Sequence, residues 1–355
     1  MMKLIFFNTI ALGDYLIHSK IIKDFKTKYN CNITAVCSEY NSRILKKQKH
    51  IDKIIIYNRN WPLLKKLNCL REIIKNKYYV SAVFDCQKFS MLANFLINSK
   101  FKRGNLIVKS KKFLFFNYNK FYPPKIFGNL LYDKYTVHLQ RSDVKKPLYI
   151  PHTWKKLFDD FNLISKKDDI YYFNPYKIEN QNKFLLLKKL KIKKYILFHF
   201  DHKWNDIKNI NDKLFENLIN LQNKINKNIL ISSYKNKFLY FKNLKLKLNS
   251  IDPIKFNLSI KNNKRIYLVN NPNLFLQERL VASSDFNISC HSGIVVHGSG
   301  ANDKKIIDIL NDEEVNYQKC WAPRKNYNVV LKKRKKNKIK INLIFKKISS
   351  IILKD

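Results

Sequence analysis

Glycine and long apolar runs are both scarce in this chain. Only 6 of its 355 residues are glycine and 9 are proline, which excludes a collagen-like or low-complexity protein. No uninterrupted apolar stretch approaches the roughly 18 residues that a membrane-spanning helix needs. The N-terminus has neither a long apolar segment nor a small-residue cleavage site, so we expect no signal peptide. These absences predict a cytoplasmic protein.

Paired cysteines are lacking as well. None of the six forms a C-x-x-C pair or lies with histidine at zinc-finger spacing, so the pattern favours neither a disulfide framework nor a zinc site. Several fall in or beside apparent strands, where free cysteine acts as a small apolar core residue, and this fits a reducing compartment. The cysteines are Cys31, Cys37, Cys69, Cys86, Cys290 and Cys320.

Acidic residues are few compared with basic ones. Lysine and arginine number 70 against 26 acidic residues, a formal net charge of +44, while a hydrophobic content of 45% excludes a disordered chain. The basic residues are spread along the chain with an excess of Asn and Ile, as an AT-rich genome produces. An even spread predicts a solvated surface and no specific nucleic-acid partner. We also expect the positive charge to favour peripheral contact with an anionic membrane.

Short apolar runs alternate with helical patterns in both halves of the chain. The helix expected after the first strand has Ile17, Ile21, Ile22 and Phe25 on one face. Continuous apolar strands between such helices indicate the α/β class, with parallel sheets covered on both faces. The predicted strands are 3–8, 33–37, 53–57, 79–85, 195–200, 228–232, 265–269, 285–289 and 305–309, and the predicted helices include 42–49, 90–97, 212–222 and 275–282.

Three segments depart from this alternation. Residues 109–125 interleave lysines with aromatic residues, which predicts a covered strand and a loop, or else a surface that stacks bases or enters a lipid headgroup layer. Residues 166–183 are polar and predict an interdomain connection. The basic run 332–340 leads into isoleucines at helical spacing over 341–352, which predicts a helix docked on the body, with a membrane anchor as the alternative.

Glycine placement points to two candidate sites. Gly13 follows the first predicted strand, and Gly293, Gly298 and Gly300 fall within eight positions after the strand 285–289. In a chain so poor in glycine, we expect these residues where φ is positive or a ligand comes close. Both turns lie where open α/β sheets bind ligands, with helix N-termini available for phosphate. One such site in each half predicts a cleft between two domains.

Histidines gather at the second of these turns. His291, Ser292, Gly293 and His297 form a dense polar constellation after the predicted strand. Residues 199–202 also contain two histidines and an aspartate, but no further ligand with supporting spacing accompanies them. We therefore predict no metal site.

Several segments resemble, in the right order along most of the chain, glycosyltransferase family 9, the ADP-heptose:lipopolysaccharide heptosyltransferases. The family's motifs are A-L-G-D, I-D-x-I-I, D-x-Q, K-x-W, A-D-L-V-I-S-x-D-[ST]-G-x-x-H-x-A and W-x-P. The matching segments are 11–14, 51–55, 85–87, Lys203-Trp204 (a contracted K-x-W), 282–301 and 321–323.

The resemblance implies a GT-B fold, in which two Rossmann-like domains with parallel sheets face a central cleft. Residues 1–170 would form the acceptor-binding domain and residues 186–325 the nucleotide-sugar-binding domain. The basic segment and helix over 326–355 would pack back on the N-terminal domain.

The resemblance also implies roles for single residues. Asp14, next to Gly13, would be the general base that deprotonates the acceptor hydroxyl. Lys203 would neutralise the diphosphate leaving group, and the adjacent Trp204 would bind the donor. Three further residues would cradle phosphate or sugar in place of a metal ion: Ser292, Gly293 and His297.

The implied activity is an inverting transfer without metal or other cofactor. A heptose-like sugar would pass from a nucleotide-diphosphate donor, ADP-linked in the family, to a lipopolysaccharide core or another cell-envelope glycan at the inner face of the cytoplasmic membrane. His291 stands where the family has the aspartate expected to bind the sugar. Two alternatives therefore stay open: a different nucleotide-sugar donor, or a non-catalytic protein that binds anionic lipid or RNA on a degenerate GT-B scaffold.

Overall fold

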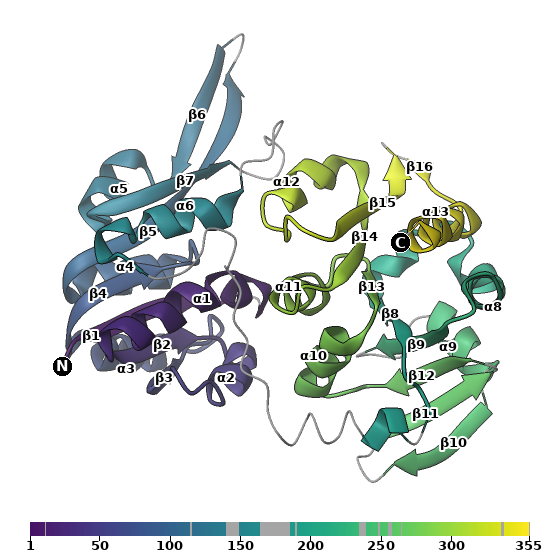
Figure 1. Cartoon of the computed structure of the whole chain (residues 1–355). Helices are drawn as coiled ribbons and strands as arrows, with labels where there is room; N and C mark the ends of the chain where they lie inside the picture. The colour runs from purple at the N-terminus through teal and green to yellow at the C-terminus, as the bar shows by residue number, and fades with distance from the viewer. Residues whose placement is uncertain are drawn as a thin grey trace. The chain divides into compact units, whose positions relative to one another are not determined.

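The structure is a computed structural model, and it describes residues 1–10, 12–113, 116–139, 149–163, 185–188, 190–233, 239–247, 249–254, 258–263, 265–334 and 337–354. The chain divides into two compact units, Met1–Asn174 and Pro175–Asp355 (Figure 1). This division falls inside the expected boundary region, but the polar connection predicted over 166–183 lies outside the described residues.

The first unit is built on one sheet with the strand order β3-β2-β1-β4-β5-β6, and β7 also pairs with β5. All of these pairs are parallel except β5 with β6. The central strand β1 pairs Leu4 with both Ile33 and Val80, and its continuous apolar sequence is buried. The strands are β1 (Lys3–Asn8), β2 (Asn32–Cys37), β3 (Lys53–Ile56), β4 (Lys77–Val83), β5 (Asn98–Phe113), β6 (Phe116–Tyr122) and β7 (Lys134–Leu139).

Helices of the first unit connect these strands in the Rossmann manner. The predicted apolar face of the first helix is confirmed, because Ile17, Ile21, Ile22 and Phe25 are all buried. The helices are α1 (Leu12–Tyr29), α2 (Glu39–Leu45), α3 (Leu63–Ile74), α4 (Lys88–Leu96), α5 (Lys125–Leu131) and α6 (Ile150–Lys156).

The second unit has its own sheet, in the order β10-β11-β12-β9-β8-β13-β14-β15-β16. Its middle, from β12 to β15, is parallel, whereas the edge strands pair antiparallel. The predicted strands of this half are all present. The strands are β8 (Tyr195–Phe200), β9 (Asn228–Ser233), β10 (Asn249–Ile254), β11 (Leu258–Asn263), β12 (Ile266–Asn270), β13 (Phe286–Ser289), β14 (Lys305–Asn311), β15 (Tyr327–Arg334) and β16 (Asn337–Lys338).

Helices again join the strands of this unit, so the chain is an α/β protein with two Rossmann-like units, as GT-B requires. The helices are the 3-10 helices η3 (His202–Asp206) and η4 (Asp312–Glu314), together with α8 (Ile210–Ile225), α9 (Leu239–Leu246), α10 (Leu274–Ser283), α11 (Gly293–Ala301), α12 (Val315–Lys319) and α13 (Ile341–Leu353).

Helix α13 corrects one prediction. Its apolar face, with Ile344, Phe345 and Ile348, belongs to the core of the second unit, where Phe345 stacks on Phe198 at 5.7 Å between ring centroids. The helix lies against α8 in the same unit. The prediction that residues 326–355 pack back on the N-terminal domain is therefore wrong. The reason lies in the preceding strand. Because β15 pairs with β14 in the second sheet, the helix that follows packs on a face of that sheet.

Residues 109–125 contain more regular structure than predicted. The segment begins within β5 and continues through the antiparallel strand β6, with Lys109 opposite Lys120. Residues 114–115, and the side chains of 110–119, lie outside the described part of the chain. Base stacking or headgroup contact by those aromatic residues therefore stays a prediction.

Among the described residues, asparagine, not glycine, occupies most left-handed backbone positions. No described glycine has a positive φ, so that part of the glycine argument is wrong. Gly104, outside the two predicted turns, is required for packing, because an added Cβ would collide with the ring of Tyr132; close approach of a ligand to the glycines of those turns stays a prediction. Asparagine tolerates left-handed φ because its short polar side chain can hydrogen-bond locally. The non-glycine residues at positive φ are Asn30, Asn162, Lys191, Asn209, Asn226, Asn271, His291, Asp303 and Asn326.

Candidate functional site

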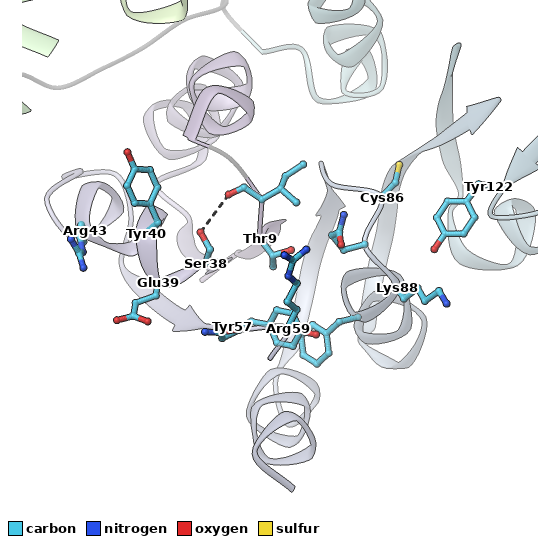
Figure 2. A pocket seen from close by; sticks show the side chains of 14 residues that line it. Thr9, Ser38, Glu39, Tyr40, Arg43, Tyr57, Arg59, Cys86, Lys88 and Tyr122 are labelled. Atoms are coloured by element: carbon cyan, nitrogen blue, oxygen red, sulfur yellow. Dashed lines mark hydrogen bonds between the residues drawn. The ribbon is translucent and has the colours of Figure 1, made fainter. Parts of the chain in front are cut away.

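A pocket of about 940 Å³ opens in the first unit where β1, β2, β3 and β4 end (Figure 2). It combines basic, aromatic and amide side chains with one acidic residue. Figure 2 shows Arg59 near the middle, with Arg43 on one side and Lys88 and Tyr122 on the other. The lining residues are Thr9, Ile10, Ser38, Glu39, Tyr40, Arg43, Tyr57, Asn58, Arg59, Cys86, Gln87, Lys88, Phe89 and Tyr122.

A buried carboxylate fixes one wall of this pocket. Asp85 is 1% exposed, and one of its oxygens accepts hydrogen bonds from the backbone N–H and the hydroxyl of Thr9, both at 2.6 Å. Its other oxygen accepts from the Gln87 backbone N–H at 3.3 Å. Burial raises the pKa of Asp85, and the hydrogen bonds oppose that rise. In the D-x-Q segment, Asp85 therefore joins the end of β4 to the turn after β1, and Gln87 lines the pocket.

Two stacked rings and a weakly acidic thiol complete this lining. The rings of Tyr57 and Phe89 stack at 3.8 Å with an interplanar angle of 9°. Burial raises the pKa of the Cys86 thiol to about 12, so this cysteine stays protonated at neutral pH. The pocket therefore offers flat apolar surface and cations, which suits a sugar that carries anionic groups.

Asp14 lies in the first turn of α1, four positions after the pocket-lining Ile10, but neither it nor Gly13 lines the pocket. It is half-buried, in the first turn of the helix, where a carboxylate interacts favourably with the helix dipole. The turn before it is held by Asn41, whose side-chain amide donates to the Ile10 carbonyl at 2.9 Å, and by the Ser38 hydroxyl at 3.4 Å.

A histidine that the sequence gave no reason to select supports this helix turn. His18 is buried, and its Nδ1 lies 2.5 Å from the Asp14 carbonyl. Burial lowers the pKa of His18 to about 3, so the ring is neutral and Nδ1 donates to that carbonyl. The ring stacks on Phe84 at 4.1 Å and meets the edge of Trp154 at 4.7 Å. The backbone of Asp14 is thereby anchored from the core.

The second candidate site is the turn between β13 and α11 in the second unit. His291 has a φ of 54°, in the left-handed region, which a side chain adopts at an energetic disadvantage. Its Nδ1 lies 2.7 Å from an oxygen of Asp308, which is fully buried on β14 and also accepts from the Tyr327 hydroxyl at 2.8 Å. The other Asp308 oxygen is buried with no hydrogen-bond partner among the described residues. Asp308 thus orients the His291 ring.

Two lysines converge on the same turn. The Lys203 ammonium donates to the His291 carbonyl at 2.6 Å. Lys332, only 3% exposed, donates to the Lys203 carbonyl at 2.6 Å and to the carboxylate of Asp206 at 3.0 Å. Lys203 and His291, two separately predicted donor-binding residues, are therefore joined through the His291 backbone.

The other residues predicted for this turn have different environments. Ser292 precedes α11 and donates its backbone N–H to the Ser289 hydroxyl at 3.1 Å, and Gly293 begins the helix. The first N–H groups of a helix lack intrahelical partners, so this turn is suited to an anion. His297 lies on the buried side of α11 and is only 4% exposed. Its contact with phosphate stays a prediction.

Trp204 is a core residue, and the prediction that it binds the donor is wrong. Its side chain is completely buried, packs against Phe200 at 4.3 Å and donates its indole N–H to the His199 carbonyl at 3.0 Å. His199 is also buried, and burial lowers its pKa to about 3. Over the described residues, no three His, Cys, Asp or Glu side chains are placed to hold a metal ion.

Sequence reasoning missed Asp308, Tyr327 and Lys332 at this site. A usable signal existed for Asp308, because it is the single acidic residue within the apolar strand K-I-I-D-I-L. An aspartate buried in a strand needs a partner, and this points to a polar network. For Tyr327 and Lys332 we find no comparable signal.

The fold is shared with solved glycosyltransferase structures, although no family model and no curated protein matches the chain. A family 9 glycosyltransferase from Veillonella parvula is similar with a TM-score of 0.71 at 9% identity, covering 100% of this chain and 98% of that one. E. coli heptosyltransferase WaaC, solved with ADP, gives 0.62 at 14% identity, with 99% of each chain covered. E. coli ADP-heptose lipopolysaccharide heptosyltransferase II gives 0.62 at 10% identity, again with 99% of each chain covered. The fold predicted from the family 9 resemblance is thus confirmed.

Proposed function

We propose that this protein is a glycosyltransferase that takes its sugar from a nucleotide-diphosphate donor. The observation that carries the proposal is the turn after β13, where Lys203, the N-terminus of α11 and an oriented His291 ring meet. Parallel α/β units bind phosphates at such strand ends. The full-length similarity to WaaC, whose structure was solved with ADP, supports the same use here.

The chemistry follows from charge placement. The Asp14 carboxylate takes the proton of the acceptor hydroxyl, the hydroxyl oxygen forms a bond to the anomeric carbon, and the bond from that carbon to the diphosphate breaks with inversion. Lys203 and the helix N-terminus neutralise the charge that develops on the diphosphate. These groups supply the role that a metal ion has in other transferases, so we propose transfer without one.

The pocket of the first unit is our candidate acceptor site. Its arginines, its lysine and its stacked rings suit an acidic sugar of a cell-envelope glycan, with the lipopolysaccharide core as the first candidate. No described helix is both long and apolar enough to cross a membrane. We propose that the protein acts in the cytoplasm at the inner face of the cytoplasmic membrane.

The donor is proposed to be ADP-linked heptose, and the nucleotide is tested by thermal unfolding with ADP, UDP, GDP and CDP in turn. A diphosphate at about 100 times its Kd stabilises the native state by about 2.7 kcal/mol. We expect the shift with ADP, and its loss in Lys203→Ala. The matched control is Lys213→Ala, an exposed lysine on α8. A shift with another diphosphate would change the donor, and no shift with any would contradict the proposed function.

A further inference from the structure

Three neighbouring helices of the first unit carry exposed apolar side chains. Helix α4 contacts α3 on one side and α5 on the other, and Figure 1 shows the three along one side of this unit. Several exposed large apolar side chains on adjoining helices are unusual on a monomer surface and are typical of interaction sites. Two from each helix, between 45% and 83% exposed, are Leu63 and Leu64, Leu92 and Leu96, and Ile126 and Phe127.

The charge of these helices identifies the partner. Helices α4 and α5 contain no acidic residue, and the one in α3, Glu72, pairs with Lys53 at 2.7 Å. Lys65, Lys88 and Lys125 are exposed on the same helices. Lysine is depleted in protein–protein interfaces, whereas leucine and phenylalanine beside lysine are typical of surfaces that lie in a lipid headgroup layer. An anionic bilayer fits both properties.

The three helices also begin at the rim of the pocket. Helix α4 starts at Lys88, which lines the pocket, and α5 starts three residues after the pocket-lining Tyr122. Helix α3 starts four residues after Arg59, another lining residue. A membrane on this face therefore lies next to the pocket mouth.

We infer that the face formed by α3, α4 and α5, which we call the docking face, binds the surface of an anionic membrane. The biological role of this docking rests on the proposed function, because docking would bring the pocket close to an acceptor that is carried on a lipid. The binding itself needs neither donor nor turnover, so it is tested separately.

The experiment is flotation of the full chain with vesicles of phosphatidylethanolamine and about 30% phosphatidylglycerol at about 150 mM salt, with phosphatidylcholine vesicles in parallel. We expect binding to the anionic vesicles only. The triple variant Leu64→Gln/Leu96→Gln/Phe127→Gln should lose at least about tenfold in affinity. The matched control changes two exposed leucines of the second unit, Leu246→Gln/Leu343→Gln, and should bind as the unchanged protein does.

The control separates docking from general attraction of the +44 chain to anions. Equal loss in both variants, or none in the triple variant, would overturn the inference, as would absence of binding by the unchanged protein. A protein dimer that the triple variant converts to monomer would also overturn it. The nucleotide-induced thermal shift, measured on the triple variant, shows that the chain is folded and tests the proposed function independently.

Discussion

In each unit, polar side chains lie where the parallel strands of the sheet end, but the two units arrange these side chains differently. In the first unit they line an open pocket of about 940 Å³. In the second, His291, Asp308, Lys203 and Lys332 bond to one another around one turn. An open lining suits a large ligand of variable shape, whereas a preorganised turn suits a small group of fixed charge and geometry such as a diphosphate. Four predictions test this contrast.

The largest expected effect is acid sensitivity of the first unit. Burial lowers the pKa of His18 to about 3 and of His50 and His138 to about 4; in the second unit it lowers that of His199 to about 3. In the unfolded chain these histidines become protonated near pH 6.5, whereas in the folded chain they stay neutral down to about pH 4. The free energy of unfolding is therefore highest above pH 6.5 and falls as the pH drops toward 4. From pH 7 to 5 we expect a loss on the order of 5 kcal/mol in the first unit and about 2 kcal/mol in the second.

Hydrogen exchange resolved by unit measures this difference. The raised pKa of Asp85 acts in the opposite direction, since its folded form gains protons more readily at low pH, and it reduces the loss in the first unit. Equal losses in the two units would show that the buried histidines do not set the acid response.

Asp14→Asn separates proton transfer from donor binding. We expect turnover to fall by about 10²–10⁴-fold because the general base is lost. Nucleotide affinity should not change, since the donor groups belong to the second unit. Asp212→Asn, a first-turn aspartate on α8, is the matched control. Turnover within a factor of two of the unchanged protein would remove Asp14 from the mechanism.

Asp308→Asn tests preorganisation of the second turn. It preserves shape but removes the charge that holds the His291 ring, and we expect about tenfold weaker nucleotide-diphosphate binding by calorimetry. Tyr327→Phe removes only the hydroxyl that donates to Asp308, so its effect should be smaller. If both variants bind as the unchanged protein does, the turn does not hold the nucleotide.

The smallest expected effect concerns the pocket. Arg59→Gln should raise the acceptor KM several-fold, roughly 1 kcal/mol, and leave the nucleotide-induced thermal shift intact. Arg71→Gln, an exposed arginine on α3, serves as the control. An equal rise in KM with Arg71→Gln would mean that general charge, not the pocket, attracts the acceptor.

The sequence predicted the centres of both sheets because those strands are buried on both faces and therefore continuously apolar. Strands β7, β10, β11, β15 and β16 were missed, because none of them is continuously apolar: β10 contains Asp252 and Pro253, and the other four contain lysine. The isoleucine stripe of α13 indicated which face is buried but not the partner, and the partner was predicted wrongly.

The sequence predicted those site residues whose location depends only on the order of the strands. Lys203 and His291 follow the ends of adjacent strands, β8 and β13, so strand order brings them together. Trp204 was assigned wrongly because it follows Lys203 in a 3-10 helix, where consecutive side chains point in different directions. The side chain of Trp204 points into the core. Arg43 lies on α2 and Arg59 in the loop after β3, and one basic residue among 70 gives no signal that it lines a pocket.

The packing of α13 on α8 has a consequence for synthesis on the ribosome. The first unit is contiguous within residues 1–174 and can fold while the rest is still being made. The second unit begins its core at β8, yet that core includes Ile348 and Ile352. Until α13 is translated, the part of α8 that packs on it has no native partner, although α8 can already pack on α9 and on the sheet. We therefore expect a chain that stops before residue 341 to keep the first unit folded and to have a second unit that is more sensitive to proteolysis.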